Sequence, residues 1–458
     1  MNVAVTDASI GRARIGRISI LEMESLKTRD NWTNWRYLGI NWLVIIGTLS
    51  LSIWAEAAAR NAGYGWEVFI PIAVLTIIII GASQHQLGGA IHEGTHFQLF
   101  ANRTLNESAS DWFAGFPIYT STHHYRLHHM AHHQFVNDPE RDPIFAQADE
   151  SGHWLDFPLT HVELVKALLR LIWLPNLAKY TIARARHSAL GLGKNPYGDP
   201  DNVGHFSVQA LGIVFAVGLP SILIGLMFAG FNSAVVMTMF FALWTAAFTF
   251  YSVIPADWFP NSRIQPVFSH RLAALNRLSF MAILYGTLTA IDLTGYGKAW
   301  AYFGLYWIVP LFTMFPVFMI FREWLQHGNT DRGRYTNSRV LMTGPLFRYA
   351  VLPWGMDYHL PHHLMATVPH YNLKKFHDLL KRDAEYAEKA VIVEGLYGRA
   401  NELTGRPTAF GALLVEHAPK KREAVYVDNA VLDRVQISDQ QAVDREARLS
   451  RSAEGQSI

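Results

Sequence analysis

Six long apolar blocks constrain the fold of this chain more than any other feature of its sequence. A bilayer core of about 30 Å requires roughly 20 apolar residues in a helix. Charged residues make up only 17% of the chain, against about 25% in ordinary soluble proteins. The sequence therefore predicts an all-α polytopic membrane protein, with candidate spans at Tyr37–Ala55, Val68–Ile91, Val208–Gly230, Ala234–Ile254, Leu278–Leu293 and Ala299–Phe321.

The last two blocks leave the number of spans between four and six. Leu278–Leu293 is short and carries Asp292, and the final block contains Pro310 and Pro316, which are expected to kink it. Lys and Arg are concentrated before the first block, between the second and third, and after the last. Because basic loops favour the cytoplasm, we expect an integral protein, of the inner membrane if bacterial, whose cytoplasmic helical cap carries every histidine cluster.

Three regions are expected along the chain. Residues 1–36 form a cytoplasmic segment, 37–381 the membrane domain with its cap, and 382–458 a charged cytoplasmic tail that is partly disordered from about Asp428. The stretch Val162–Tyr180 is amphipathic, and fits equally a helix on the membrane surface or a packed helix of the cap. The net charge of +2 gives no indication of nucleic-acid binding, and the absence of cysteine excludes iron–sulfur and thiolate zinc sites.

Histidines form three clusters whose spacing is typical of metal ligands. The members lie one helical turn apart or side by side, which lets their rings reach a common ion. Pro361 is expected to open a helix, with His359 just before it. The eight histidines exceed the needs of one ion with four to six ligands, so we expect two. Neutral imidazole binds iron, copper and zinc, and a pair of ions that changes oxidation state favours iron. The clusters are His92 and His96; His129, His132 and His133; and His359, His362 and His363.

Two other functions fit part of this pattern. The run from His92 to His96 is also H-E-x-x-H, which indicates an intramembrane zinc protease with Glu93 as general base. That interpretation leaves the other two clusters without a role. A histidine-rich metal transporter would need ionisable residues within its spans, whereas Asp292 alone lies in one, near its end.

The order H-x3-H, H-x2-H-H, H-x2-H-H resembles the membrane fatty acid desaturase superfamily. The residues that follow His133 and His363 are also similar to that family, and the resemblance extends from about Asn41 to Lys381. It implies a ninth ligand at His327, before which many relatives carry Glu where this chain has Gln326. Glu323, one turn earlier, is a candidate for the missing carboxylate.

The resemblance also implies a reaction. Two non-haem iron ions would use dioxygen to oxidise unactivated C–H bonds of a lipid acyl chain, most simply by desaturation, with hydroxylation or ketolation of a lipid, carotenoid or other apolar substrate as the alternative. A separate electron donor of the ferredoxin, rubredoxin or cytochrome type would be needed.

Other polar residues near the clusters have less defined roles. His85 lies two helical turns before His92, and fits either a supporting contact or hydrogen-bonded packing. His123, His124 and His128 are expected at the surface or around the ligands. Three acidic residues could orient ligand imidazoles through the free ring nitrogen, namely Asp138, Asp142 and Asp357.

Overall fold

The computed structural model describes residues 20–192, 196–199, 201–295 and 297–414. Within this part of the chain, six helical segments are long and apolar enough to cross a membrane, the upper end of the predicted range. The third and sixth are each divided by a π-helical turn. The six are Thr33–Asn61 (α2), Trp66–Thr95 (α3), Phe206–Phe228 (α9, Phe206–Ile213, and α10, Leu219–Phe228), Ser233–Val253 (α11), His270–Leu293 (α12) and Ala299–His327 (α13, Ala299–Phe303; α14, Val309–Phe312; α15, Met314–His327).

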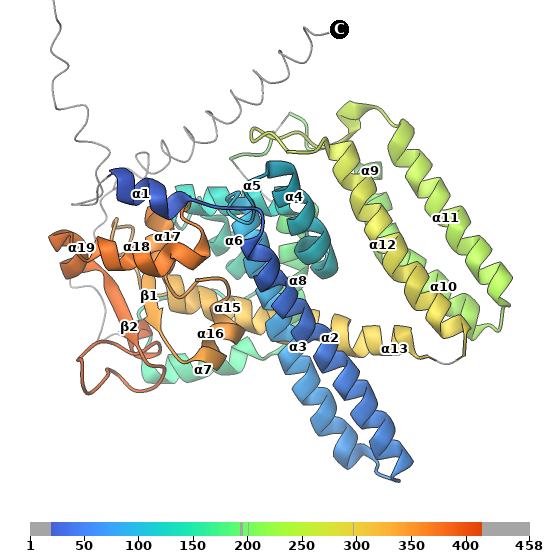
Figure 1. The fold of residues 1–458 in the computed structure, drawn as a ribbon, viewed down its shortest axis with the longest axis horizontal. Coiled ribbons are helices and arrows are strands. Elements are labelled where there is room, and N and C mark those ends of the chain that lie inside the picture. The colour runs from blue at the N-terminus through green and yellow to red at the C-terminus, as the bar shows by residue number, and fades with distance from the viewer. Residues whose placement is uncertain (1–19, 193–195, 200, 296, 415–458) are drawn as a thin grey trace, which may run out of the picture.

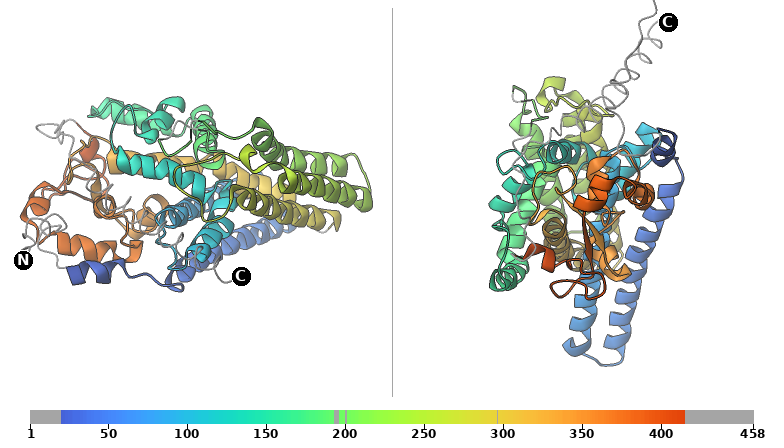
Figure 2. Two further views of the ribbon diagram at one scale, coloured as in Figure 1. Left: turned by 90° about the horizontal axis from the view of Figure 1, so that it is seen from above. Right: turned by 90° about the vertical axis from the view of Figure 1, so that its left-hand side faces the viewer.

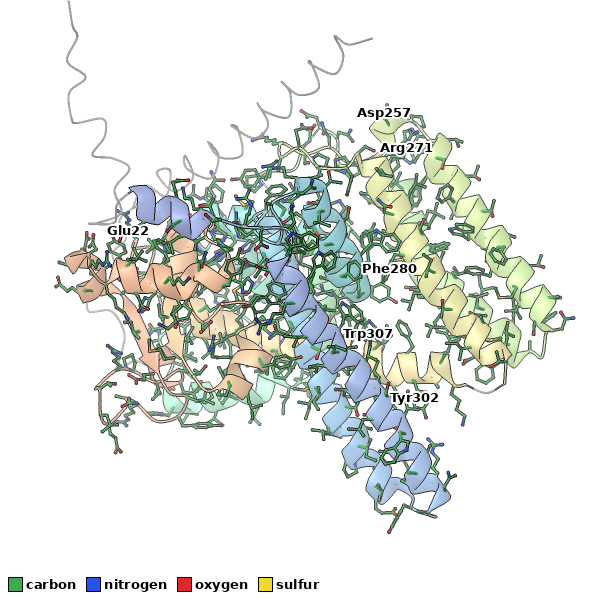
Figure 3. All side chains as sticks on the ribbon, in the orientation of Figure 1. Glu22, Asp257, Arg271, Phe280, Tyr302 and Trp307 are labelled. Carbon is green, nitrogen blue, oxygen red and sulfur yellow. The ribbon has the colours of Figure 1, made fainter. Side chains whose placement is uncertain are left out.

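The spans form two groups (Figure 1). The antiparallel hairpin α2–α3 packs against α14 and α15, and α9 to α12 form a second bundle with its own apolar core. Asn232 caps α11 by accepting a hydrogen bond from the amide of Val235 at 3.0 Å, at the tight turn that joins α10 to α11. Phe280 of α12 joins the bundle to the rest of the molecule through Trp112, whose ring centre is 5.7 Å away (Figure 3).

The last two spans differ in detail from the prediction. Helix α12 begins at His270, eight residues before the apolar block, because Ser269 caps it and Arg277 donates to the carbonyl of Ala189 at 2.8 Å. The last span is interrupted at Thr313, between its two prolines. Asp292 accepts from the backbone amide of Ala299 at 2.5 Å, so it caps α13 rather than lining a path through the span.

A helical cap sits at one end of the spans (Figure 2). It contains a parallel two-stranded sheet in which Arg339 pairs with Val391. Three apolar clusters hold it together, and one includes Leu325 of α15. Its elements are α1 (Ile20–Lys27), α4 (Arg103–Ser110), α5 (Thr122–Gln134), α6 (Pro143–Glu150), α7 (His161–Leu171), α8 (Leu174–Arg184), β1 (Arg339–Met342), α16 (Pro345–Val351), α17 (His359–Leu364), α18 (Leu373–Leu380), α19 (Ala384–Lys389) and β2 (Val391–Glu394).

Two regions of the cap bear on the sequence predictions. Helix α7 buries Leu164 and Leu171 against the cap, yet leaves Val165 and Leu169 exposed. It therefore has both the packed face of a cap helix and an apolar outer face. Residues up to Leu414 pack in the same core as β1, although we expected the membrane domain to end at 381. The disorder predicted from about Asp428 lies outside the described residues.

Candidate metal centre

The nine predicted histidines converge in two neighbouring groups. In each group, one nitrogen from every ring lies within 4.8 Å of one nitrogen from every other ring. The two are called here the five-histidine group and the four-histidine group. The five-histidine group is His92, His96, His129, His133 and His362, and the four-histidine group is His132, His327, His359 and His363.

Separations between ring nitrogens within the groups suit a metal ion with ligands at right angles. His133 Nε2 lies 3.0 Å from His129 Nε2 and 3.1 Å from His362 Nε2. In the other group, His359 Nε2 lies 2.9 Å from His327 Nε2 and 3.0 Å from His363 Nε2. With a metal–nitrogen bond of about 2.1 Å, ligands at right angles lie about 3.0 Å apart and tetrahedral ligands about 3.4 Å apart. The donor atoms therefore fit ions with five or six ligands better than tetrahedral zinc.

Each ligand triplet is held by a short helix. Helix α5 places His129, His132 and His133 on one face, so that His132 reaches the four-histidine group and the other two the five-histidine group. Helix α17 begins at His359, not at Pro361 as expected. A proline fits the third position of a helix because backbone amides in the first turn need no intrahelical acceptor.

Burial keeps most of these rings neutral. The pKa values of His129, His133 and His362 lie well below the usual range, because burial disfavours the charged ring and neighbouring imidazoles add repulsion. The pKa values of His359 and His363 are lowered in the same way. Neutral imidazole is the form that binds metals.

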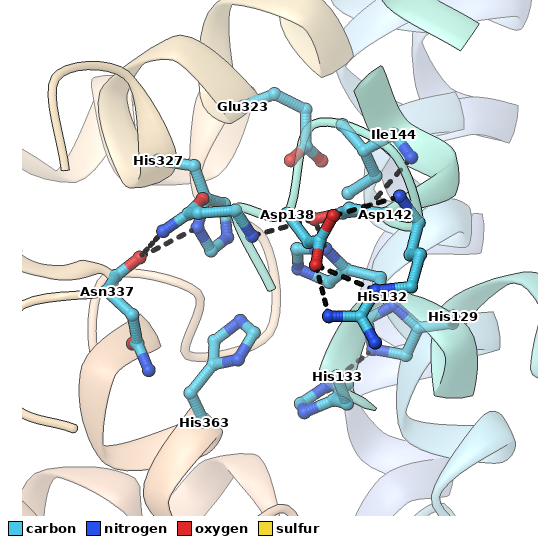
Figure 4. A network of polar contacts seen from close by, with 12 residues as sticks. His129, His132, His133, Asp138, Asp142, Ile144, Glu323, His327, Asn337 and His363 are labelled. Atoms are coloured by element: carbon cyan, nitrogen blue, oxygen red, sulfur yellow. Dashed lines mark hydrogen bonds and ion pairs between the residues drawn. The ribbon is translucent and has the colours of Figure 1, made fainter. Parts of the chain in front are cut away.

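Two rings are oriented from behind by an acceptor (Figure 4). His132 Nδ1 lies 2.8 Å from Asp142 Oδ2, and His327 Nδ1 lies 3.0 Å from the carbonyl oxygen of Asn337. Burial opposes a charge on His132, yet the Asp142 carboxylate outweighs it and raises the pKa of this ring. Each acceptor holds the ring proton at Nδ1, which leaves Nε2 as the donor atom toward its group.

The other two carboxylates expected to orient ligands do not do so. Asp138 pairs with Arg141 at 2.5 Å and with Arg332 at 3.0 Å, and Asp357 pairs with Arg348 at 2.9 Å. Both carboxylates form ion pairs with arginine and not with a ligand histidine, so that expectation was wrong for Asp138 and Asp357.

A cavity of about 350 Å3 adjoins both groups. Its wall includes His92 and His129 of the five-histidine group and His132, His327 and His359 of the four-histidine group. The rest is mainly apolar, with polar side chains from α5, α6, α8, α15 and the segments that connect the helices. An apolar cavity with convergent polar groups is the usual form of a small-molecule site.

The comparisons with known proteins agree with this arrangement. The family model of fatty acid desaturases matches residues 65–259 and 243–394, a range that includes all nine histidines. The chain belongs to the fatty acid desaturase family. Dihydrorhizobitoxine desaturase of Bradyrhizobium elkanii is 22% identical over 343 residues, which cover 74% of this chain and 76% of that protein.

Glu323 lies beside the histidines of this desaturase without joining either group. It forms an ion pair with Arg322 and lines the cavity with His132 and His327, toward which it faces in Figure 4. Gln326 donates to the carbonyl of Met356 at 2.8 Å, so this glutamine fixes α15 to the loop before α17.

His85 proves to be a hydrogen-bonded packing residue. Its Nδ1 lies 2.8 Å from the carbonyl oxygen of Ala350, and its Nε2 lies 3.3 Å from Arg322 Nη1. It therefore supports the Arg322–Glu323 pair rather than a ligand.

The other three histidines of α5 lie outside both groups. His123 and His128 are buried and His124 is half-buried. His123 Nε2 lies 3.1 Å from the hydroxyl of Ser262, and His124 Nδ1 lies 2.9 Å from the carbonyl of Ala189. His128 lines the cavity.

Glu93 does not occupy the position of a general base. Its Oε2 accepts a hydrogen bond from the backbone amide of His370 at 2.9 Å, and its Oε1 lies 3.5 Å from His92 Nδ1. The carboxylate thus lies behind the ligand ring, and His92 and His96 share their group with three more histidines. This arrangement disfavours the zinc protease.

Two features near the histidines were not predicted. The carbonyl of Asn337 behind His327 is a backbone group, which no sequence motif marks. Arg184, buried in the cavity wall, stands among many basic residues of the loop region and carried no distinguishing signal.

Proposed function

We propose that this desaturase holds two iron ions, one in each histidine group, and oxidises C–H bonds of an acyl-chain substrate in an oxygen-dependent reaction that forms a double bond. The single observation that carries the proposal is the division of nine histidines, eight of them buried and His327 half-buried, into two adjacent groups beside one cavity. Ring nitrogens about 3 Å apart favour five or six ligands per ion, and iron accepts imidazole ligands and changes oxidation state.

The chemistry supplied by bound iron is reduction of dioxygen to two waters, with two hydrogens from adjacent substrate carbons and two electrons and two protons from a donor. The chain itself supplies position. Asp142 and the Asn337 carbonyl fix the Nδ1 proton of one ligand each. The apolar cavity holds the alkyl segment beside the histidines and excludes water, so alignment determines which C–H bond reacts.

The proposal includes the setting of the enzyme. The cap would face the cytoplasm, as the distribution of Lys and Arg favours, in the inner membrane if the cell is bacterial. A separate electron donor of the ferredoxin, rubredoxin or cytochrome type would dock on that side, because the chain has no cysteine with which to hold an iron–sulfur cluster.

The test is mass spectrometry of fatty acids and lipids from cells that express the wild type or His132→Ala, under air and without oxygen. We expect a product lighter by two hydrogens, formed only by the wild type in air. A product heavier by one oxygen would show that the enzyme is a hydroxylase and not a desaturase. Identical lipids in all four samples would contradict the proposal, if the protein contains iron and the cells also supply a suitable electron donor.

A further inference from the structure

Arg184 is a buried cation without a carboxylate partner. It ends α8, its side chain lies in the cavity wall, and the residue is 6% exposed. Nη2 donates to the carbonyl of Ile118 at 3.2 Å, and the guanidinium stacks over the Phe315 ring, 5.0 Å from its centre. A guanidinium has five N–H donors, and one of them makes the hydrogen bond to Ile118.

The other buried charges of the cavity wall are compensated within the chain. Arg322 is paired with Glu323, and Asp142 is bonded to His132. Among the described residues of the wall, Arg184 is the cation for which no carboxylate lies within ion-pair distance. Burial of a lone charge is costly, so an anion from outside the chain is the natural partner.

Arg184 lies close to the histidines, with which it shares the cavity wall. Tyr125 stacks on the ring of His129 at 5.4 Å between centres, and the charge of Arg184 interacts with the phenols of Tyr125 and Tyr180. Burial lowers the pKa of Arg184 only to about 10, so the guanidinium is charged at neutral pH.

The cavity wall near Arg184 also contains a second hydrogen-bond donor and an irregular turn of backbone. Gln147 Nε2 faces the same cavity, is buried and has no hydrogen-bond partner. Directly after Arg184 the helix widens into a π-helical turn, Ala185–Ala189, and Ser188 of this turn also lines the cavity. Turns of this kind often occur at functional sites.

We propose that Arg184 binds a free carboxylate of the substrate, inside the cavity that adjoins the two histidine groups. The inference rests on the proposed function and specifies its substrate class: a short free carboxylic acid, in place of an acyl chain esterified to a lipid. One uncompensated cation matches the single charge of a carboxylate better than the double charge of a phosphate.

The size of the cavity supports the same class. At about 350 Å3 it is near the lower end of ligand cavities, which span about 300–1,000 Å3. Because the carboxylate and the reacting C–H bond share this space, the bond that reacts would lie only a few carbons from the acid group.

The experiment measures binding by calorimetry, on the purified full chain with its metal content determined. The probes are hexanoate, octanoate and decanoate, with methyl octanoate as the uncharged match. In Arg184→Gln we expect carboxylate affinity to fall by at least about tenfold, because a hydrogen-bonded charge is lost. Methyl octanoate should bind both proteins equally, and Arg184→Lys should retain part of the carboxylate affinity.

Arg186→Gln is the matched control, because Arg186 is a half-exposed arginine two residues away, paired with Glu150 at 3.1 Å and absent from the cavity wall. It should bind octanoate as the wild type does. Norleucine differs from hexanoate by an α-amino group, so the affinities of the two show whether the natural acid carries such a group. Stronger binding of either one supports the proposal, if that binding depends on Arg184.

Two outcomes would overturn the inference: equal octanoate affinity in wild type and Arg184→Gln, or methyl octanoate binding the wild type as tightly as octanoate. If Arg184→Gln does not fold, the ester comparison and the Arg184→Lys variant still decide. Oxidation of lipids without a role for Arg184 would leave the proposed function intact. Carboxylate binding through Arg184 by a protein that takes up no iron would leave this inference intact and remove the proposed function.

Discussion

His132 shows how a single residue is prepared to bind a metal. It lies on the same face of α5 as His129 and His133, but the Asp142 carboxylate behind it fixes its proton at Nδ1. Asp142 Oδ2 also accepts from the backbone amide of Asn137 at 3.0 Å, which holds the carboxylate in place. The ring is therefore directed before any ion arrives.

We predict that Asp142→Asn weakens metal binding and activity by about 10–100-fold, the usual effect of removing a carboxylate behind a ligand histidine. Iron retained after exposure to increasing chelator concentrations measures the effect. Asp138→Asn is the matched control: this carboxylate is four residues away and pairs with Arg141 and Arg332. Equal iron retention in the two variants would refute the role given to Asp142.

At this scale the sequence predicted which histidines of α5 share a helical face, but not the contacts that support them. Regular spacing along a helix determines that His129, His132 and His133 share a face. It carries no information on which distant arginine reaches a carboxylate, and so Asp138 and Asp357 could not be distinguished from Asp142 before Arg332 and Arg348 were located.

At the scale of elements, α3 is the central support of the site. It carries His92, is followed directly by His96, and packs against α2, α5, α15 and α16. A Cβ atom at Gly81 would overlap the side chain of Met314, at the start of α15. The same helix α15 ends at His327, so the close approach at Gly81 sets where a ligand of the four-histidine group lies relative to the five-histidine group.

We predict that Gly81→Ala destabilises the protein by about 1–3 kcal/mol, the usual cost of overpacking, and reduces the iron held by the four-histidine group. Thermal unfolding and metal analysis in detergent measure both effects. Gly47→Ala on α2 is the control, because nothing lies within 4 Å of a Cβ there; it should be neutral or stabilising by up to about 1 kcal/mol. The account of α3 fails if the two variants behave alike.

Apolar block length predicted the existence of the spans but not all of their limits. The start of α12 depends on the Ser269 cap and on Arg277 reaching a carbonyl of another segment. Helix α17 begins before Pro361 because its first turn tolerates proline. Hydropathy describes neither the contacts that set the start of α12 nor the tolerance for proline that permits the start of α17.

At the scale of the whole molecule, cap and spans together surround the histidines. Helix α3 and helix α15 deliver ligands from the spans, and α5 and α17 deliver them from the cap. The all-α polytopic fold was predicted from the apolar blocks. That the three histidine clusters of the sequence come together in space could be expected only from the resemblance to the desaturase family. Spacing along the chain does not determine distances between distant segments.

Burial of so many neutral rings makes a prediction about pH. Above a pH of about 6.5, the ordinary histidine pKa, these rings are neutral in both folded and unfolded protein. Below it the unfolded chain binds protons, whereas the folded metal-free protein, with lowered pKa values at His129, His133 and His362, does not. For each such ring, the free energy of unfolding should therefore fall by up to about 1.4 kcal/mol for every unit by which the pH is lowered below about 6.5.

Thermal unfolding of the metal-free protein across this pH range is the measurement. We expect the midpoint to decrease as pH falls from about 7.5 to about 5.5. A midpoint that is constant or rises on acidification would show that the rings accept protons in the folded state.

The most direct test of the central claim is the metal content of the purified protein, determined by mass spectrometry for the wild type and for one variant in each group. We predict about two iron ions per chain in the wild type, and about one in His362→Ala, of the five-histidine group, and in His327→Ala, of the four-histidine group. Wild-type protein that binds no iron after expression in iron-rich medium, or variants that both retain two ions, would contradict a paired-iron centre.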